Sequence, residues 1–112
     1  MTSTNQSTIS AEVSVIPIGT NTGKSSISKE VAAAFDAIRK TEGLKSISLT
    51  SMGTQIQAYN MSGILKAIES AHQAVKSTGA KRVISIIHID ERLDESKTMD
   101  DKIKSVKEKL RK

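Results

Sequence analysis

Two short runs of alternating polar and apolar residues lie close together near the middle of the chain. They are LKSISLT, residues 44–50, and TQIQA, residues 54–58, and only SMG separates them. A connection this short joins neighbouring antiparallel strands, whereas parallel strands need a crossover of a dozen or more residues. The chain is therefore expected to build an antiparallel sheet rather than a parallel nucleotide-binding fold.

A strand and a helix are predicted before this hairpin, and a helix and a strand are predicted after it. Residues 9–18 alternate with the period of a strand, residues 81–90 form an apolar strand, and residues 27–40 and 61–77 have helical spacing. The expected N-caps are Ser26 or Ser28 for the first helix and Asn60 for the second.

A last helix is predicted near the C-terminus, where Thr98 and Asp101 have the spacing of a capping box. The full order predicts an α+β fold, the ferredoxin-like split βαβ arrangement (βαββαβ) with an antiparallel sheet and an added C-terminal helix. The 112 residues suffice for one modest core. We expect residues 9–112 to form this single domain and residues 1–8 to be disordered.

In this fold both main helices cover one face of the sheet, and the other face is left open. The last strand is apolar on both sides and would lie at a sheet edge, where an uncovered apolar strand invites pairing. We therefore expect a homodimer or homotetramer that buries the open face or the edge. The alternative is that the added helix covers the open face by itself.

Composition argues against several classes of protein. Cysteine is absent, so there is no disulfide, thiolate nucleophile or cysteine metal site. Phe35 and Tyr59 are the only aromatic residues, which is too few for an RNA-binding sheet that stacks bases. The apolar runs are too short to span a bilayer, and the start of the chain lacks the pattern of a signal peptide. We expect a cytoplasmic protein with no nucleic-acid or membrane partner.

The segment IPIGTNTGKSS, residues 16–26, is close to a phosphate-binding loop. That motif needs four residues between its two glycines, and here Gly19 and Gly23 have three between them. The apolar strand that ends at Asp90 would supply the magnesium-binding carboxylate of such a site. Because an antiparallel sheet does not suit this motif, we expect neither Lys24 nor Asp90 to serve nucleotide chemistry.

The two histidines give weak signals. His72 lies on the apolar stripe of the second helix, where a lone histidine is usually a core or interface residue. His88 and Asp90 share one strand face and could form half of a metal site or an acid–base pair, but a third ligand is lacking nearby. We expect no metal site and no catalytic residues.

Two polar segments that contain Gly-Thr, GTNTGKSSIS and SMGTQIQ, are the better candidates for a binding site. Small residues such as Gly19 leave room for a compact ligand, and polar side chains could fix its edge. These side chains are the hydroxyls of Thr20, Ser26, Ser28 and Thr54 and the amide of Gln57. The alternative interpretation is that the hydroxyls only cap the first helix and shape turns.

Six blocks of the sequence lie in order between Ile9 and Leu110: SVIPIGT, SISKEVAAAFDAIRKT, TSMGTQIQ, IESAHQAV, KRVISIIHIDERLD and TMDDKIKSVKEKL. Together they resemble the small thiamine-binding protein family of bacteria, archaea and fungi. The resemblance implies a ferredoxin-like protomer, dimers assembled into tetramers, and binding of thiamine or its hydroxymethylpyrimidine moiety without known catalysis.

The same resemblance matches Gly19, Thr20, Ser26 and Ser28 to the family's first-loop motif, and Thr54 with Gln57 to its second. The family commonly has a Glu-Gly pair where this chain has Gln57-Ala58, and a glutamine can form the hydrogen bonds but not the charge interaction of a carboxylate. We expect a binding protein, not an enzyme, for thiamine or a hydroxymethylpyrimidine-type precursor, acting as carrier, sensor or salvage component. The alternative is a structural or protein-interaction oligomer with no physiological ligand.

Overall fold

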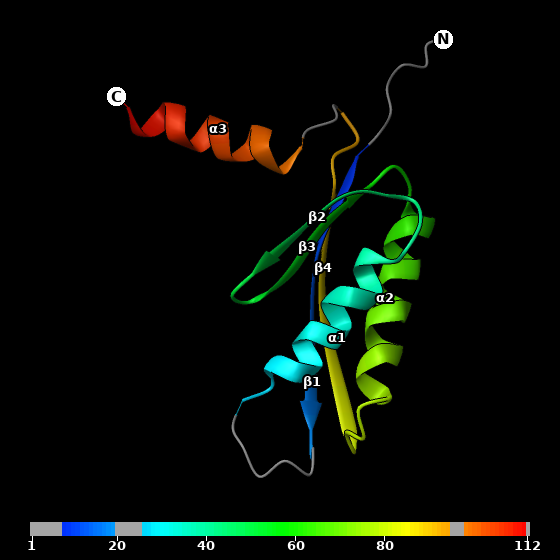
Figure 1. Ribbon diagram of the computed structural model, residues 1–112. Helices are drawn as coiled ribbons and strands as arrows, with labels where there is room; N and C mark the ends of the chain where they lie inside the picture. Colours follow the sequence, from blue (N-terminus) through cyan, green and yellow to red (C-terminus); the bar gives the residue numbers. More distant parts are fainter. Residues whose placement is uncertain (1–7, 20–25, 95–97, 112) are drawn as a thin grey trace.

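The computed structural model of the protein describes residues 8–19, 26–94 and 98–111. The expected order of elements is confirmed (Figure 1): β1 (Ile9–Ile18), α1 (Ser28–Arg39), β2 (Leu44–Thr50), β3 (Gly53–Ala58), α2 (Met61–Lys76), β4 (Arg82–Glu91) and α3 (Met99–Leu110). We predicted disorder for residues 1–8, and residues 1–7 lie outside the described ranges. Thr8, the one described residue among them, is buried.

The four strands form one sheet in the order β2-β3-β1-β4, and every neighbouring pair is antiparallel. This confirms the ferredoxin-like arrangement, with β4 at one edge as expected. The tight hairpin is also confirmed, because β2 ends at Thr50 and β3 begins at Gly53. β1 pairs with β4 along its whole length but with β3 only from Ile9 to Val13.

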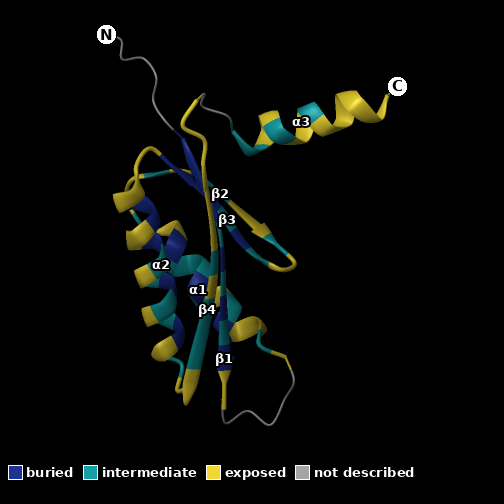
Figure 2. Cartoon of the chain, turned by 180° about the vertical axis from the view of Figure 1, so that it is seen from behind, coloured by how far each residue is buried: buried dark blue, intermediate teal, exposed yellow. Residues whose placement is uncertain are grey.

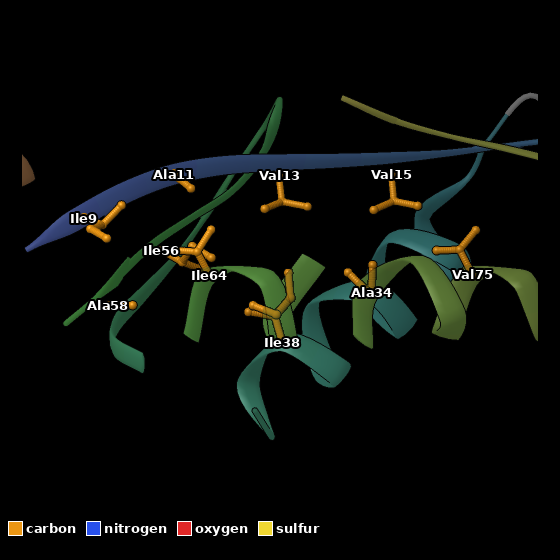
Figure 3. Close-up of a cluster of buried hydrophobic side chains, with 12 residues drawn as sticks. Ile9, Ala11, Val13, Val15, Ala34, Ile38, Ile56, Ala58, Ile64 and Val75 are labelled. Atoms are coloured by element: carbon orange, nitrogen blue, oxygen red, sulfur yellow. The ribbon is translucent and has the colours of Figure 1, made fainter. Parts of the chain in front are cut away.

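The helices α1 and α2 lie side by side against one face of the sheet, and the core lies between them and the strands (Figure 3). Every second residue of β1 and β3 points to this inner face, as a strand with one buried face requires. The buried apolar residues are Ile9, Ala11, Val13, Val15, Ile56 and Ala58 from the strands and Ala34, Ile38, Ile64, Ala67, Ala71 and Val75 from the helices. Burial of each larger side chain contributes about 1.5–3 kcal/mol.

The predicted helix caps are confirmed for two helices and wrong for one. The side chain of Asn60 accepts a hydrogen bond from the Gly63 backbone N–H at 3.0 Å, and Thr98 with Asp101 forms the capping box of α3. The N-cap of α1 is Ile27, without a side-chain cap. Ser26 comes one residue before this position and Ser28 is already the first residue of the helix, and their hydroxyl oxygens lie 3.2 Å apart.

The third helix extends away from the rest of the molecule (Figures 1 and 2). None of its residues is buried, and its apolar stripe, Ile103, Val106 and Leu110, is 52%, 58% and 77% exposed. The alternative that the added helix covers the open sheet face by itself is therefore wrong. Among the described helices, none has both the length and the apolar character needed to cross a membrane.

Candidate ligand-binding site

A cavity of about 120 Å³ lies between α1 and the β2–β3 hairpin. Its apolar wall comes from α1 and from the inner face of β1, with Ile27, Val31 and Ala34 on the helix side. The hairpin turn supplies the opposite wall, from Thr50 to Thr54. A single water needs about 10–15 Å³ of such space, so the cavity has room for a small organic group.

One edge of β1 borders the cavity, and only part of this edge pairs with another strand. Pairing between β1 and β3 stops at the pair Val13 and Thr54, and beyond it β4 is the only described strand that pairs with Ser14 to Ile18. Along an antiparallel strand, backbone N–H and C=O groups point alternately to one side and the other. Because Ser14, Val15 and Ile16 line the cavity, this edge offers backbone donors and acceptors to a ligand.

Thr54 is the predicted site residue that lines this cavity. It lies at the last rung between β3 and β1 and is buried. The glycine before it lets the hairpin approach β1 closely, because a Cβ on Gly53 would lie only 2.9 Å from the Val13 carbonyl oxygen. The local sequence Gly53-Thr54 thus places a small hydroxyl residue at the inner end of the cavity.

Of the other residues predicted from the first polar segment, the structure describes Gly19, Ser26 and Ser28. Gly19 follows β1 with a φ of 76°, in the left-handed region that favours glycine. Thr20 lies outside the described residues, as do Gly23 and Lys24. Ser26 and Ser28 are exposed, and Ile27 between them lines the cavity instead.

Gln57 lies on the opposite face of the sheet from Thr54. Its side-chain amide nitrogen donates to the Ser46 hydroxyl, and its amide oxygen accepts from the Met99 backbone N–H at 3.2 Å. The structure therefore separates Gln57 from the cavity beside α1 and uses both ends of its amide to connect β2, β3 and α3. Ligand binding by the predicted residues stays a prediction.

Both histidines contact other polar residues. The His72 ring nitrogen Nδ1 lies 2.6 Å from the Ser85 hydroxyl, as expected for a satisfied histidine between helix and sheet. His88 lies 3.8 Å from the Glu12 carboxylate, and Asp90 forms an ion pair with Lys102. Within residues 8–19, 26–94 and 98–111, no group of three or more His, Cys, Asp or Glu side chains could hold a metal ion.

The sequence model of the thiamine-binding protein family matches residues 11–107 of the chain. The chain belongs to this family. The resemblance found in the sequence blocks is thereby confirmed. A UPF0045 protein of Methanothermobacter thermautotrophicus is 40% identical over 102 residues, which cover 91% of this chain and 99% of that protein. The Bacillus subtilis protein YqgV, also a UPF0045 protein, is 36% identical and covers 89% of this chain and 95% of its own.

Solved structures of related proteins share the fold of this thiamine-binding family member. A hypothetical protein of Methanocaldococcus jannaschii superposes with a TM-score of 0.78 at 36% identity, covering 90% of this chain and 97% of that chain. A Thermotoga maritima protein, described as a candidate for thiamine biosynthesis or salvage, has a TM-score of 0.69 at 14% identity and covers 88% and 98%. At that identity the second likeness shows the fold alone.

Proposed function

We propose that this protein binds thiamine or a hydroxymethylpyrimidine-type precursor in the cavity between α1 and the β2–β3 hairpin, as a cytoplasmic carrier, sensor or salvage component that catalyses no reaction. Membership of the thiamine-binding family supports a thiamine-related role. The location of the binding site is inferred from one observation: the edge of β1 that borders the cavity does not pair with β3 beyond Val13.

An aminopyrimidine fits such an edge for a simple chemical reason. Its exocyclic N–H lies next to a ring nitrogen acceptor, and this donor–acceptor pair can form hydrogen bonds with the C=O and N–H groups of an extended strand. The apolar wall, with Val31 and Ala34 of α1, would lie against the flat ring. Thr54 would give one further hydrogen bond to the hydroxymethyl or amino group.

The cavity wall also predicts which form of the ligand binds well. Among the described lining residues there is no charged and no aromatic side chain. The positive thiazolium ring of thiamine therefore finds neither a carboxylate nor an aromatic face there. We expect the uncharged hydroxymethylpyrimidine to bind at least as tightly as thiamine.

Calorimetric titration with hydroxymethylpyrimidine and with thiamine tests this function. We expect heat of binding with hydroxymethylpyrimidine, and about tenfold weaker binding by Thr54→Val, because about 1–1.5 kcal/mol of hydrogen bonding is lost. The matched control is Thr78→Val, which removes a hydroxyl that bonds the Val75 carbonyl at the end of α2. Absence of heat with both compounds at millimolar concentration would refute the proposal.

A different observation supports the second candidate function, a structural or protein-interaction homo-oligomer. The outer edge of β4 is unpaired among the described strands, Ile86 on its open face is 48% exposed, and the stripe of Ile103, Val106 and Leu110 on α3 faces solvent. We propose that further copies of the chain cover these surfaces in a homodimer or homotetramer.

Light scattering at micromolar concentration tests this assembly. The expected mass is that of a dimer or tetramer, and Ile103→Ser with Val106→Ser is expected to lower it. Lys104 is an exposed residue of the same helix, and the control variant Lys104→Ser should leave the mass unchanged. A monomeric mass for the unmodified chain would contradict the assembly.

A further inference from the structure

The open face of the sheet has a second cleft, of about 190 Å³, at the base of α3. It lies on the opposite side of the sheet from the cavity beside α1, because Ser10, Glu12 and Gln55 occupy outward-facing positions. His88 and Asp90 of β4 line it as well, and the first turn of α3 adds Met99 and Lys102.

The unpaired hydroxyl of Ser10 is the first observation that indicates a ligand in this cleft. The residue is only 6% exposed, and its hydroxyl oxygen has no hydrogen-bond partner. It is the one buried side-chain polar atom without a partner in the described part of the chain. Buried hydroxyls normally find a partner because an unsatisfied one costs free energy. A bound polar molecule would provide that partner.

Glu12, two residues along the same strand face, is the second sign. The Gln55 amide nitrogen lies 3.4 Å from one of its carboxylate oxygens, and His88 Nδ1 lies 3.8 Å from the other. Both contacts are long for hydrogen bonds, so the carboxylate can still accept strong ones. Its side chain is 33% exposed and is thus within reach of a small molecule.

The charge of the cleft selects the class of ligand. Asp90 is neutralised by its ion pair with Lys102, and His88 carries a charge only when protonated. When His88 is neutral, Glu12 therefore leaves the cleft with an unbalanced negative charge, which favours a cation. Among hydrogen-bonding cations, a planar group that donates two parallel N–H groups forms an especially strong and specific pair with a carboxylate.

We propose that this cleft binds a small planar organic cation with forked N–H donors, of the amidinium or guanidinium class. Glu12 accepts the two N–H groups of the fork, and the Ser10 hydroxyl pairs with a polar atom deeper in the cleft. Met99 lines the cleft beside them and gives an apolar surface for the planar group. This site is separate from the proposed pyrimidine cavity and does not depend on it.

Calorimetric titration with benzamidine tests the proposal, with benzamide as the uncharged analogue of the same shape. We expect benzamidine to bind and benzamide to bind at least tenfold more weakly. Glu12→Gln is expected to weaken benzamidine binding at least tenfold and Ser10→Ala severalfold. Glu69→Gln, an exposed carboxylate on α2, is the control that should leave it unchanged.

Three results would overturn the proposal: no binding of benzamidine, equal binding of benzamidine and benzamide, or full binding by Glu12→Gln. The comparison of the two compounds on the unmodified chain holds even if a variant fails to fold. Hydroxymethylpyrimidine affinity separates the two sites, because Glu12→Gln should not change it. A Ser10→Ala variant that is more stable but binds benzamidine equally well would show that the hydroxyl is not part of a site.

Discussion

Thr54 and Gln57 belong to the same strand, but their side chains lie on opposite faces of the sheet. Thr54 is opposite Val13 on β1, whose side chain faces the helices, and Gln57 is opposite Ser10, which faces outward. Successive side chains of a strand alternate between faces, so residues three apart cannot share a face in a regular strand. Thr54 therefore lines the cavity beside α1, and the Gln57 amide connects α3 to the sheet.

Gln57→Ala is expected to loosen α3. The Gln57 amide oxygen accepts from the Met99 backbone N–H at the start of the helix, and one turn later Lys102 forms an ion pair with Asp90. Hydrogen exchange of the amides between Met99 and Leu110 should become faster. In the control, Ser46→Ala, only the other hydrogen bond of the amide is lost. Unchanged exchange in Gln57→Ala would show that the contact does not hold α3.

Asn60→Ala is expected to destabilise the protein by about 1 kcal/mol, because the N-cap bond to the Gly63 backbone N–H is lost. Denaturant unfolding followed by circular dichroism measures the change in the free energy of unfolding. Asn60→Asp keeps an oxygen acceptor at the cap, so we expect it to retain most of the stability. Equal loss in both variants would argue against a capping role.

Gly63→Ala is expected to be destabilising although alanine is the better helix former. A Cβ at this position would lie 2.9 Å from the Gly43 carbonyl oxygen and 3.1 Å from the Ala58 Cβ. Relief of that overlap should cost about 1–3 kcal/mol, more than the gain of about 1 kcal/mol in helix propensity. Ser62 is the exposed residue next to it, and Ser62→Ala serves as the control without such an overlap. A stabilised Gly63→Ala in urea unfolding would show that α2 can move away from the loop at Gly43.

Asp36 on α1 is expected to titrate at a lower pH than an ordinary aspartate. Its pKa is lowered first by the hydrogen bond from Lys40, whose Nζ lies 2.8 Å from the carboxylate, and then by Arg39. Because folding lowers this pKa, the contribution to stability is present above the unfolded pKa and is lost as the pH falls through the folded pKa.

An NMR titration of the carboxyl carbons checks the Asp36 prediction. Lys40→Gln should raise the midpoint of Asp36, whereas Lys76→Gln in α2 should leave it in place. The same midpoint in the unmodified chain and in Lys40→Gln would contradict the assigned cause. Because Asp36 is exposed to solvent, we expect its effect on stability to be small.

Local patterns predicted much of the fold. The hairpin between Thr50 and Gly53, the Asn60 cap and the Thr98–Asp101 capping box each depend on residues within a few positions of one another. The N-cap of α1 could not be predicted in this way, because Ser26 and Ser28 both have the chemistry of a cap and yet the helix begins after Ile27, which lies between them.

The candidate site was less predictable for a different reason. The cavity is bordered by the backbone edge of Ser14 to Ile16, and backbone groups are the same for every residue type. Gln57 has suitable chemistry for a ligand, but its contact with Met99, 42 residues away, could not be inferred from spacing. The cleft at Ser10 and Glu12 depends on how α3 meets β4, which is also a long-range relationship.

The central claim is that a pyrimidine binds beside α1 along the free edge of β1. The most direct measurement is an NMR titration of the backbone amides with hydroxymethylpyrimidine. We expect the largest shifts between Ser14 and Ile16, at Thr54 and at Val31, with little change at Ser46 and Gln57 on the other face. The absence of shifts at saturating ligand, or shifts concentrated on the open face, would contradict the account.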